Sequence, residues 1–501
     1  MRTKNIFTFL SFSILLTGSG CKKFLDKKLL GQYTPGNFFT SDANAQMALS
    51  AAYAQMSFTS GASNAIWVLG DVASDDAIKG GQPGDQADFD AIDQFNILPT
   101  NSAVEAVWRR YYDGVFRCNV VLDGLPANNT AVSDAAKKSV IAEARFLRAY
   151  YYFHLAICYG DIPLHLKVET PEELQSPALP QDSIFRQVEQ DLLAAAPDLA
   201  DATHGRYLGG ASKWAALSLL AKTYLFHTSL PNHFQLAAQY AQQVVDSKQY
   251  SLTKNYWDNF SAATKDNTEA ILTVNHISGA QPIQGNELNA WFSPRSLTGY
   301  GFFYPTQDLV DNFDAGDPRL DYTVGRQGHP YFDKDFDPSW STTGYITKKM
   351  VQPLSEVPIG RKNDGSVNYE AIRYAEVLLI LAEGLNESGN SAGALAPLDS
   401  VRRRARESYL NDPSLPGYGT VPAGLLPKVT TTDQGQLRDA IRKERRAELA
   451  MEFHRFFDVI RYGSAYATSA LLKGAPNFNY EKNKWFPIPQ SERDTNKKLG
   501  K

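Results

Sequence analysis

Aromatic side chains with polar neighbours are the residues of this sequence best suited to recognising a ligand, and many lie in two stretches, about 60–101 and 278–347. A sugar ring has an apolar C–H face and a rim of hydroxyls, so its site needs a flat aromatic surface beside carboxylates, amides or guanidinium groups. The candidate ligand-binding residues are Trp67, Asp75, Asp76, Trp291, Arg295, Tyr300, Tyr304 and Trp340. Each ring could instead pack its loop against the rest of the protein, and the sequence leaves that alternative open.

Two carboxylates seven residues apart, Glu376 and Glu383, invite comparison with the acid and nucleophile of a glycosidase. Those groups stand roughly 5 to 9.5 Å apart in such enzymes, whereas two helical turns separate these residues by about 10 Å along the axis. We therefore interpret both as scaffold residues in ion pairs. Glu143, Arg145 and Arg148 are interpreted in the same way, because a buried unpaired charge is costly.

No motif in the sequence supplies a catalytic, metal or cofactor site. There is no Gly-x-Ser-x-Gly elbow, His-Glu-x-x-His, Walker loop or dinucleotide fingerprint, and the eight histidines form no ligand-spaced cluster. The three cysteines include no CxxC pair that would suggest zinc. We expect Cys118 and Cys158 to be buried free thiols, and a disulfide between them stays open as the alternative.

The charge pattern argues against nucleic acid as a partner. Fifty basic and 54 acidic residues give a formal net charge of -4, which offers no broad attraction to phosphates. Two basic runs, 402–404 and 442–446, lack interleaved aromatic residues. In the second run, glutamates at 444, 448 and 452 follow the bases at four-residue steps, which predicts a salt-bridged helix face.

The first twenty residues have the pattern of a secretory signal peptide. Arg2 and Lys4 precede an apolar run over 6–16, and the small residues 18–20 precede Cys21. The run is too short to span a membrane, and a cysteine after small residues predicts lipid attachment at Cys21. Gly18 departs from the Leu or Val usual in a lipobox, so a secreted soluble protein is the alternative.

Helical periodicity predicts the elements that must position the candidate site. Apolar residues recur at three- and four-residue steps over 45–56, 140–151, 217–224 and 234–245, and again within 369–462. Small alanines beside large aromatic residues on these stripes are typical of tetratricopeptide-type helix pairs. Residues 270–274 predict a strand, and 485–489 an extended segment. We expect a mainly α fold, a tetratricopeptide-like helix-pair scaffold with a loop-rich ligand-binding region and minor β structure.

Segments spread over the whole chain carry a family resemblance. They are Cys21 with 24–26, 37–42, Trp108 with 111–119, 142–151 with 159–164, 305–310 with 317–319, 373–380, 441–449, 455–463 and 487–489. In this order they resemble the SusD/RagB outer-membrane nutrient-binding lipoproteins of the Bacteroidetes. The resemblance predicts a signal peptide at 1–20, a helical N-terminal region at 21–275 and a C-terminal region at 276–501, loop-rich over 276–350 and helical over 369–462.

What the resemblance implies is a non-enzymatic protein held in the outer membrane by a lipid on Cys21, facing outward. It would capture an oligosaccharide, or in some members a peptide, and deliver it to a TonB-dependent transporter of the SusC type. Lys22 and Lys23 stand where surface-exported relatives often carry acidic residues. The alternatives are a glycan-processing surface enzyme and a helical-repeat scaffold that binds only protein.

Overall fold

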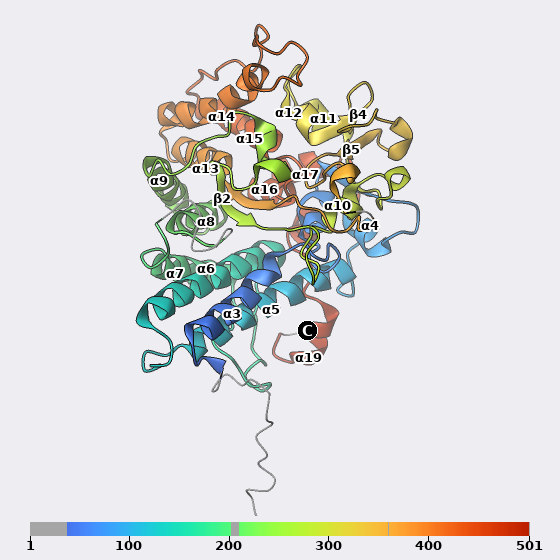
Figure 1. Cartoon of the computed structure of the whole chain (residues 1–501). Helices are drawn as coiled ribbons and strands as arrows, with labels where there is room; N and C mark the ends of the chain where they lie inside the picture. The colour runs from blue at the N-terminus through green and yellow to red at the C-terminus, as the bar shows by residue number, and fades with distance from the viewer. Residues whose placement is uncertain (1–37, 202–209, 359, 500–501) are drawn as a thin grey trace, which may run out of the picture.

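The fold is mainly helical, as predicted, with a helical scaffold along one side and a loop-rich part along the other (Figure 1). The computed structural model describes residues 38–201, 210–358 and 360–499. The predicted signal peptide and Cys21 lie outside these residues. Within them, no helix combines the length and the apolar composition needed to cross a membrane.

The long helices form the scaffold by packing each against the next. They are α3 (Asp42–Tyr53), α5 (Ser102–Gly124), α6 (Asp134–Tyr159), α7 (Gln181–Ala195), α8 (Lys213–Phe226), α9 (His233–Asp246), α13 (Tyr374–Glu387), α14 (Ser391–Asn411) and α15 (Gln434–Leu449). Contacts run from α3 to α5 and through α6, α7, α8 and α9 to α13 and α14. Figure 1 shows these helices rising along one side of the molecule. The four predicted stripes before residue 246 lie on these helices, except that the last residues of the first stripe form a 3-10 turn at Ala54–Met56.

Local sequence explains where these helices begin and how closely they pack. The hydroxyls of Ser133 and Ser212 accept hydrogen bonds from backbone N–H groups in the first turns of α6 and α8, which satisfies donors that a helix leaves open. Gly384 lets α13 approach α9, because a Cβ there would lie 2.7 Å from the Phe234 carbonyl oxygen. Capping thus sets where these helices begin, and small residues such as Gly384 set how closely they pack.

The loop-rich part is built from short elements joined in antiparallel pairs. Its helices are α4 (Ala87–Asp93), α10 (Leu288–Phe292), α11 (Gln307–Asn312), α12 (Arg319–Thr323), α16 (Arg455–Arg461), α17 (Ser464–Leu471) and α18 (Tyr480–Asn483), with one π-helical turn at Val68–Val72. The last short helix, α19 (Gln490–Thr495), lies beside α5 on the scaffold instead. Strand β1 (Ala77–Gly80) pairs with β3 (Phe302–Pro305), and β4 (Val324–Arg326) with β5 (Tyr345–Thr347). Both predicted loop stretches therefore contain regular structure, too short to give a periodic pattern.

A third strand pair joins the segments that precede and follow the loop stretch 278–347. The predicted strand β2 (Ala270–Val274) pairs with β6 (Tyr369–Arg373). The sequence analysis placed 369–373 in a helical block, and this was wrong: the segment is a strand whose five residues are all buried. A strand buried on both faces loses the alternation that would distinguish it from a buried helix. One continuous apolar core contains residues of both parts.

Helix α15 carries a buried network of charges. Glu444 and Glu448 on α15 and Glu452 just after it follow at the predicted four-residue steps, but all three are 1% exposed or less. Their partners come from elsewhere in the fold: Arg319, Lys349, Arg373, Arg402 and Arg404. The prediction that these glutamates are salt-bridged is confirmed, but their partners are not the bases of the same run: the pairs are buried cross-links between elements.

Distances within this network are those of charge-assisted hydrogen bonds. Arg373 donates from Nη1 to Glu269 at 2.8 Å and from Nη2 to Glu452 at 2.8 Å, and it also pairs with Glu448. Arg404 donates to Glu269 at 2.8 Å and also contacts Glu448. Burial opposes ionisation of Glu448, but Arg404 and Arg373 outweigh it and lower the pKa of this carboxyl. The network fixes β6, α14 and α15 relative to one another.

The other carboxylates weighed as catalytic are in structural ion pairs. Glu376 pairs with Lys222 at 2.9 Å and with Arg445 at 2.9 Å, and Glu383 pairs with Arg461. The scaffold interpretation of this pair is confirmed.

The ion-pair interpretation of Glu143, Arg145 and Arg148 holds only in part. Arg148 forms two hydrogen bonds of 2.8 Å to Asp191, and Glu143 accepts one from Tyr53. Arg145 is half-buried and has no carboxylate within ion-pair distance among the described residues, so the ion-pair prediction fails for it. Cys118 and Cys158 are buried free thiols, as expected.

Candidate functional site

Two of the candidate ring platforms are core residues. Trp67 is 0% exposed, its Nε1 donates to the Gly61 carbonyl at 3.2 Å, and its ring meets those of Phe89, Phe292 and Phe303 edge-on. Trp291 is 6% exposed, and its ring lies 5.9 Å from that of Trp67. Neither presents a ring face to a ligand, so the prediction is corrected for both. They pack the loop-rich part internally, the alternative that the sequence left open.

The two candidate carboxylates are also structural. Asp75 accepts from Arg455 Nε at 2.7 Å, and Asp76 accepts from Arg446 Nε at 2.7 Å. The side chains of both are at most 5% exposed. Burial disfavours the charge on Asp75, but Arg455 and Arg446 outweigh it and lower the pKa of this carboxyl. The prediction that Asp75 and Asp76 bind ligand is corrected, because their oxygens already serve these arginines.

The other four candidates lie together around Gly301. The Tyr304 hydroxyl donates to the Trp340 carbonyl at 3.0 Å, although Tyr304 itself is only 4% exposed. Gly301 has φ +70°, and a Cβ there would lie 2.8 Å from the Tyr304 hydroxyl and 3.2 Å from Arg295 Cγ. Glycine therefore permits both the turn and the close approach. Tyr300, the next residue back, is half-buried, as is Trp340, and Arg295 is exposed.

Two residues that the sequence analysis missed complete this surface. Asp85 forms an ion pair with Arg295, and Lys362 Nζ lies 4.3 Å from the centre of the Tyr300 ring. Asp85 could have been suspected, because it directly follows the turn-forming residues 80–84. Lys362 lies outside both stretches and gave no signal. We call this surface the Gly301 face, formed by Asp85, Arg295, Tyr300, Gly301, Tyr304, Trp340 and Lys362.

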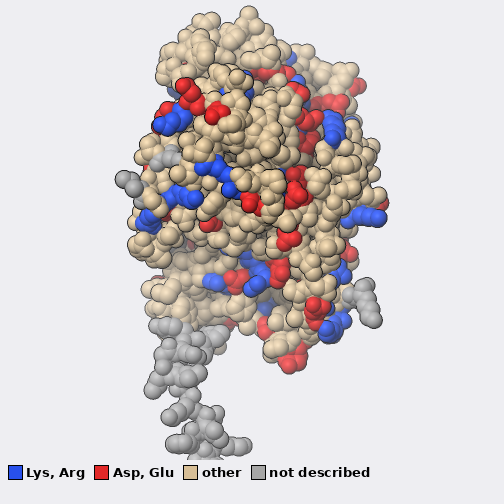
Figure 2. Space-filling model, turned by 90° about the vertical axis from the view of Figure 1, so that its right-hand side faces the viewer, with Lys and Arg blue, Asp and Glu red and all other residues tan. Residues whose placement is uncertain are grey.

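A small cleft adjoins the Gly301 face. It has a volume of about 320 Å³ and is lined by Ser293, Pro294, Leu297, Tyr331, Phe332, Asp333, Lys334, Gln352, Pro353 and Ser355. The ring of Tyr331 lies 5.6 Å from that of Trp340, edge to face, which links the cleft to the face. Figure 2 shows the loop-rich side of the molecule, where acidic and basic side chains are interspersed. The charges on this side of the molecule thus do not favour a large ligand that is only positively or only negatively charged.

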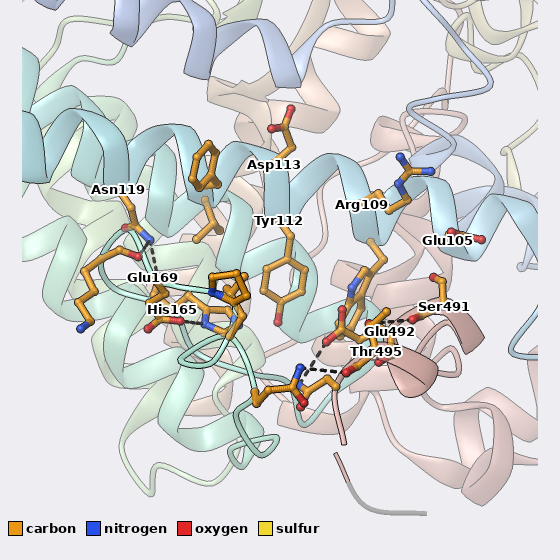
Figure 3. A pocket seen from close by; sticks show the side chains of 18 residues that line it. Glu105, Arg109, Tyr112, Asp113, Asn119, His165, Glu169, Ser491, Glu492 and Thr495 are labelled. Atoms are coloured by element: carbon orange, nitrogen blue, oxygen red, sulfur yellow. Dashed lines mark hydrogen bonds and ion pairs between the residues drawn. The ribbon is translucent and has the colours of Figure 1, made fainter. Parts of the chain in front are cut away.

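A larger cleft lies on the helical scaffold, where no candidate residue had been predicted. We call it the α5 cleft; its volume is about 820 Å³ and it lies between α5, the segment 165–175 and α19 (Figure 3). Its lining includes Glu105, Trp108, Arg109, Tyr112, Phe116, His165, Glu169, Leu174, Gln175, Ser491, Glu492 and Thr495. Rings at 108, 112 and 116 recur at four-residue steps, and this was the signal that sequence reasoning overlooked.

Comparisons with known proteins point to one family over nearly the whole chain. The family model described as the SusD family matches residues 268–501, and the model described as starch-binding associating with outer membrane matches residues 23–225. SusD-like protein P2 of Formosa agariphila is 28% identical over 97% of each chain. SusD-like protein P25 of the same organism is 24% identical and covers 92% of this chain and 90% of its own.

Solved structures agree with these matches. A laminarin-binding SusD-like protein is 28% identical, with a TM-score of 0.74 over 91% of this chain and 98% of its own. A SusD-like carbohydrate-binding protein from Bacteroides fragilis is 25% identical, with a TM-score of 0.76 over 92% of this chain and 100% of its own. Both relatives are named for binding.

Proposed function

Because the chain belongs to the SusD/RagB family, we propose that it binds an oligosaccharide on its Gly301 face without altering it chemically. The observation that carries this proposal is the convergence of Arg295, Tyr300 and Trp340 on one glycine turn. Arg295 and Tyr300 lie in the segment 295–301 and Trp340 in a later loop, and the Tyr304 hydroxyl, which lies against Gly301, connects that loop to the turn.

The chemistry of the Gly301 face suits a sugar. Half-buried rings at Tyr300 and Trp340 offer apolar area that can cover the C–H face of a pyranose. Arg295 and Asp85 are partly exposed, at 41% and 36% of their side chains, so both can exchange part of their ion pair for hydrogen bonds to hydroxyls. Relatives named for laminarin and carbohydrate binding support this ligand class.

The proposed setting is the outer membrane. We assign Cys21 as the lipid attachment site, with the protein facing outward and passing its ligand to a SusC-like TonB-dependent transporter. Support comes from the order of charged, apolar and small residues before Cys21 and from the match to the family described as starch-binding associating with outer membrane.

The anchor can be tested in the native host. Replacing Cys21 with alanine should move the protein from the membrane fraction to the soluble fraction, because the acyl chains would have no attachment point. Immunoblotting of the two fractions measures the shift, and Cys118→Ala is the matched cysteine control. Retention of the Cys21→Ala protein in the membrane would contradict the anchor.

The ring contacts can be tested by calorimetry with laminarin oligosaccharides. Alanine at Tyr300 or Trp340 should each weaken binding by roughly 1 to 3 kcal/mol, the scale of a lost aromatic contact. The Trp340 carbonyl that accepts from Tyr304 remains in the variant. Tyr418→Ala, at an exposed ring elsewhere, should bind as the wild type does.

Two results would count against the proposed function. Wild-type affinity in both ring variants would remove the Gly301 face as the site. New reducing ends, appearing when the protein is incubated with laminarin, would replace binding with hydrolysis.

A further inference from the structure

We propose that the α5 cleft is a second carbohydrate site, which binds a linear oligosaccharide along α5 independently of the Gly301 face. The cleft lies on the helical scaffold between α5, the segment 165–175 and α19 (Figure 3). Its volume of about 820 Å³ is within the range of roughly 300 to 1,000 Å³ typical of ligand sites.

A row of rings forms the floor. Trp108, Tyr112 and Phe116 follow one face of α5 at four-residue steps, and each step advances about 6 Å along a helix. That advance is close to the length that one pyranose adds to an extended chain. Phe116 is 51% exposed and Tyr112 is half-buried, while Trp108 is 4% exposed, so Tyr112 and Phe116 offer the accessible ring area. Figure 3 shows Tyr112 pointing from α5 toward the space between the segment 165–175 and α19.

Polar groups surround the rings, as a sugar's hydroxyls require. Glu105, Glu492, Ser491 and Thr495 lie at one end of the cleft, and the His165–Glu169 pair lies at the other (Figure 3). His165 Nδ1 and the Glu169 carboxylate are 2.5 Å apart, with side chains 12% and 13% exposed. Carboxylates and hydroxyls can accept from or donate to sugar hydroxyls in several orientations.

The segment 165–175 forms one wall of the cleft, and hydrogen bonds from α5 and α6 hold it in place. Asn119 Nδ2 donates to the carbonyls of His165 and Lys167 at 3.0 and 3.1 Å. The Tyr112 hydroxyl donates to the Pro163 carbonyl at 2.7 Å, and Arg148 donates to that of Leu166 at 3.0 Å.

The other wall is α19 with the residues just after it, and three hydrogen bonds tie it to the end of the first wall. Gln175 donates from Nε2 to the Thr495 carbonyl at 2.9 Å and accepts at Oε1 from the Lys497 N–H at 2.9 Å, and Asn496 donates to the Ser176 carbonyl at 2.9 Å. These hydrogen bonds hold both walls in place without closing the cleft between them. A preformed cavity loses little entropy when a ligand enters.

The floor and lining favour a saccharide over a peptide. Peptides commonly bind as an added strand, which needs free backbone groups, or as a helix in an apolar groove. The floor here is the middle of a long helix, whose backbone groups bond to one another. Glu105, Arg109, Glu169 and Glu492 interrupt the apolar lining. Neither mode fits, whereas rings bordered by carboxylates suit a sugar chain.

The experiment isolates the α5 cleft in the full mature chain. Tyr300→Ala and Trp340→Ala are combined to silence the Gly301 face, and laminarihexaose, cellohexaose and maltohexaose are each added at millimolar concentration. At least one should slow hydrogen exchange in 165–175 and 491–497. Adding Phe116→Ala should weaken that hexaose about tenfold, the loss of one stacked ring, and Phe116→Trp should restore it. Met47→Ala, exposed on the neighbouring α3, is the matched control.

The outcomes are distinct. Absence of protection with all three hexaoses overturns the second site, as does protection that Phe116→Ala leaves unchanged. Protection of the cleft by a tryptic digest of casein, and by none of the hexaoses, also overturns it in favour of a peptide site. Cleft protection in a protein whose Gly301 face never bound sugar would instead retain this site and remove the first.

Discussion

Replacing Arg404 with alanine should lower the free energy of unfolding by about 3 to 5 kcal/mol, the usual cost of removing one partner of a buried ion pair. The Arg404 side chain is 4% exposed and contacts Glu269 and Glu448, both 0% exposed. Without it, two buried carboxylates lose a cation that water cannot replace. Urea unfolding at pH 7, followed by circular dichroism, measures the change.

The neighbouring residue supplies a matched control. Arg403 is the same residue type on the same helix, one position back, but it is exposed. Arg403→Ala should change the unfolding free energy by no more than about 0.5 kcal/mol. Equal and small losses in the two variants would mean that the α15 charge network contributes little to stability.

Replacing Glu370 with glutamine should make the protein more stable than the wild type at pH 9 and similar to it at pH 5. Burial raises the pKa of Glu370 from 4.5 to about 8, and its carboxyl accepts from the Thr273 hydroxyl at 2.7 Å. In the folded state this carboxyl is neutral at pH 5 and charged at pH 9. The wild type should therefore lose stability, on the order of 4 kcal/mol, as the pH rises.

The direction of this pH effect follows from the protons that the folded and the unfolded states bind. Because the folded pKa lies above the unfolded one, the contribution of Glu370 is complete below about pH 4.5 and is lost as the pH rises through about 8. Glutamine resembles the neutral carboxyl and does not titrate. Melting temperatures at five pH values from 5 to 9 test this, with the exposed Glu172→Gln as control. Parallel curves for wild type and Glu370→Gln would contradict the prediction.

The scaffold could be predicted because its signals are local. Stripes such as the one over 140–151 fall on helices, and the strand at Ala270–Val274 was recognised from five consecutive residues. Strand β6 was not, because a strand buried on both faces has no alternating pattern.

The site was harder to predict because burial of a loop residue depends on distant partners. Trp67 and Tyr300 both lie in the two stretches expected to carry the site, yet only the tertiary structure places one residue in the core and leaves the other half-buried. Asp76 meets Arg446, 370 residues along the chain. Composition identified the loops that carry the Gly301 face, and it could not select the residues within them.

That long separation has a consequence for biosynthesis. Asp76 leaves the ribosome well before Arg446, and at about 5 to 20 residues per second the interval is on the order of half a minute. Throughout it, a carboxylate destined for the interior has no arginine to neutralise it, and the segment around it cannot settle into its final place. The packing around Asp76 can be completed only after Arg446 has been made.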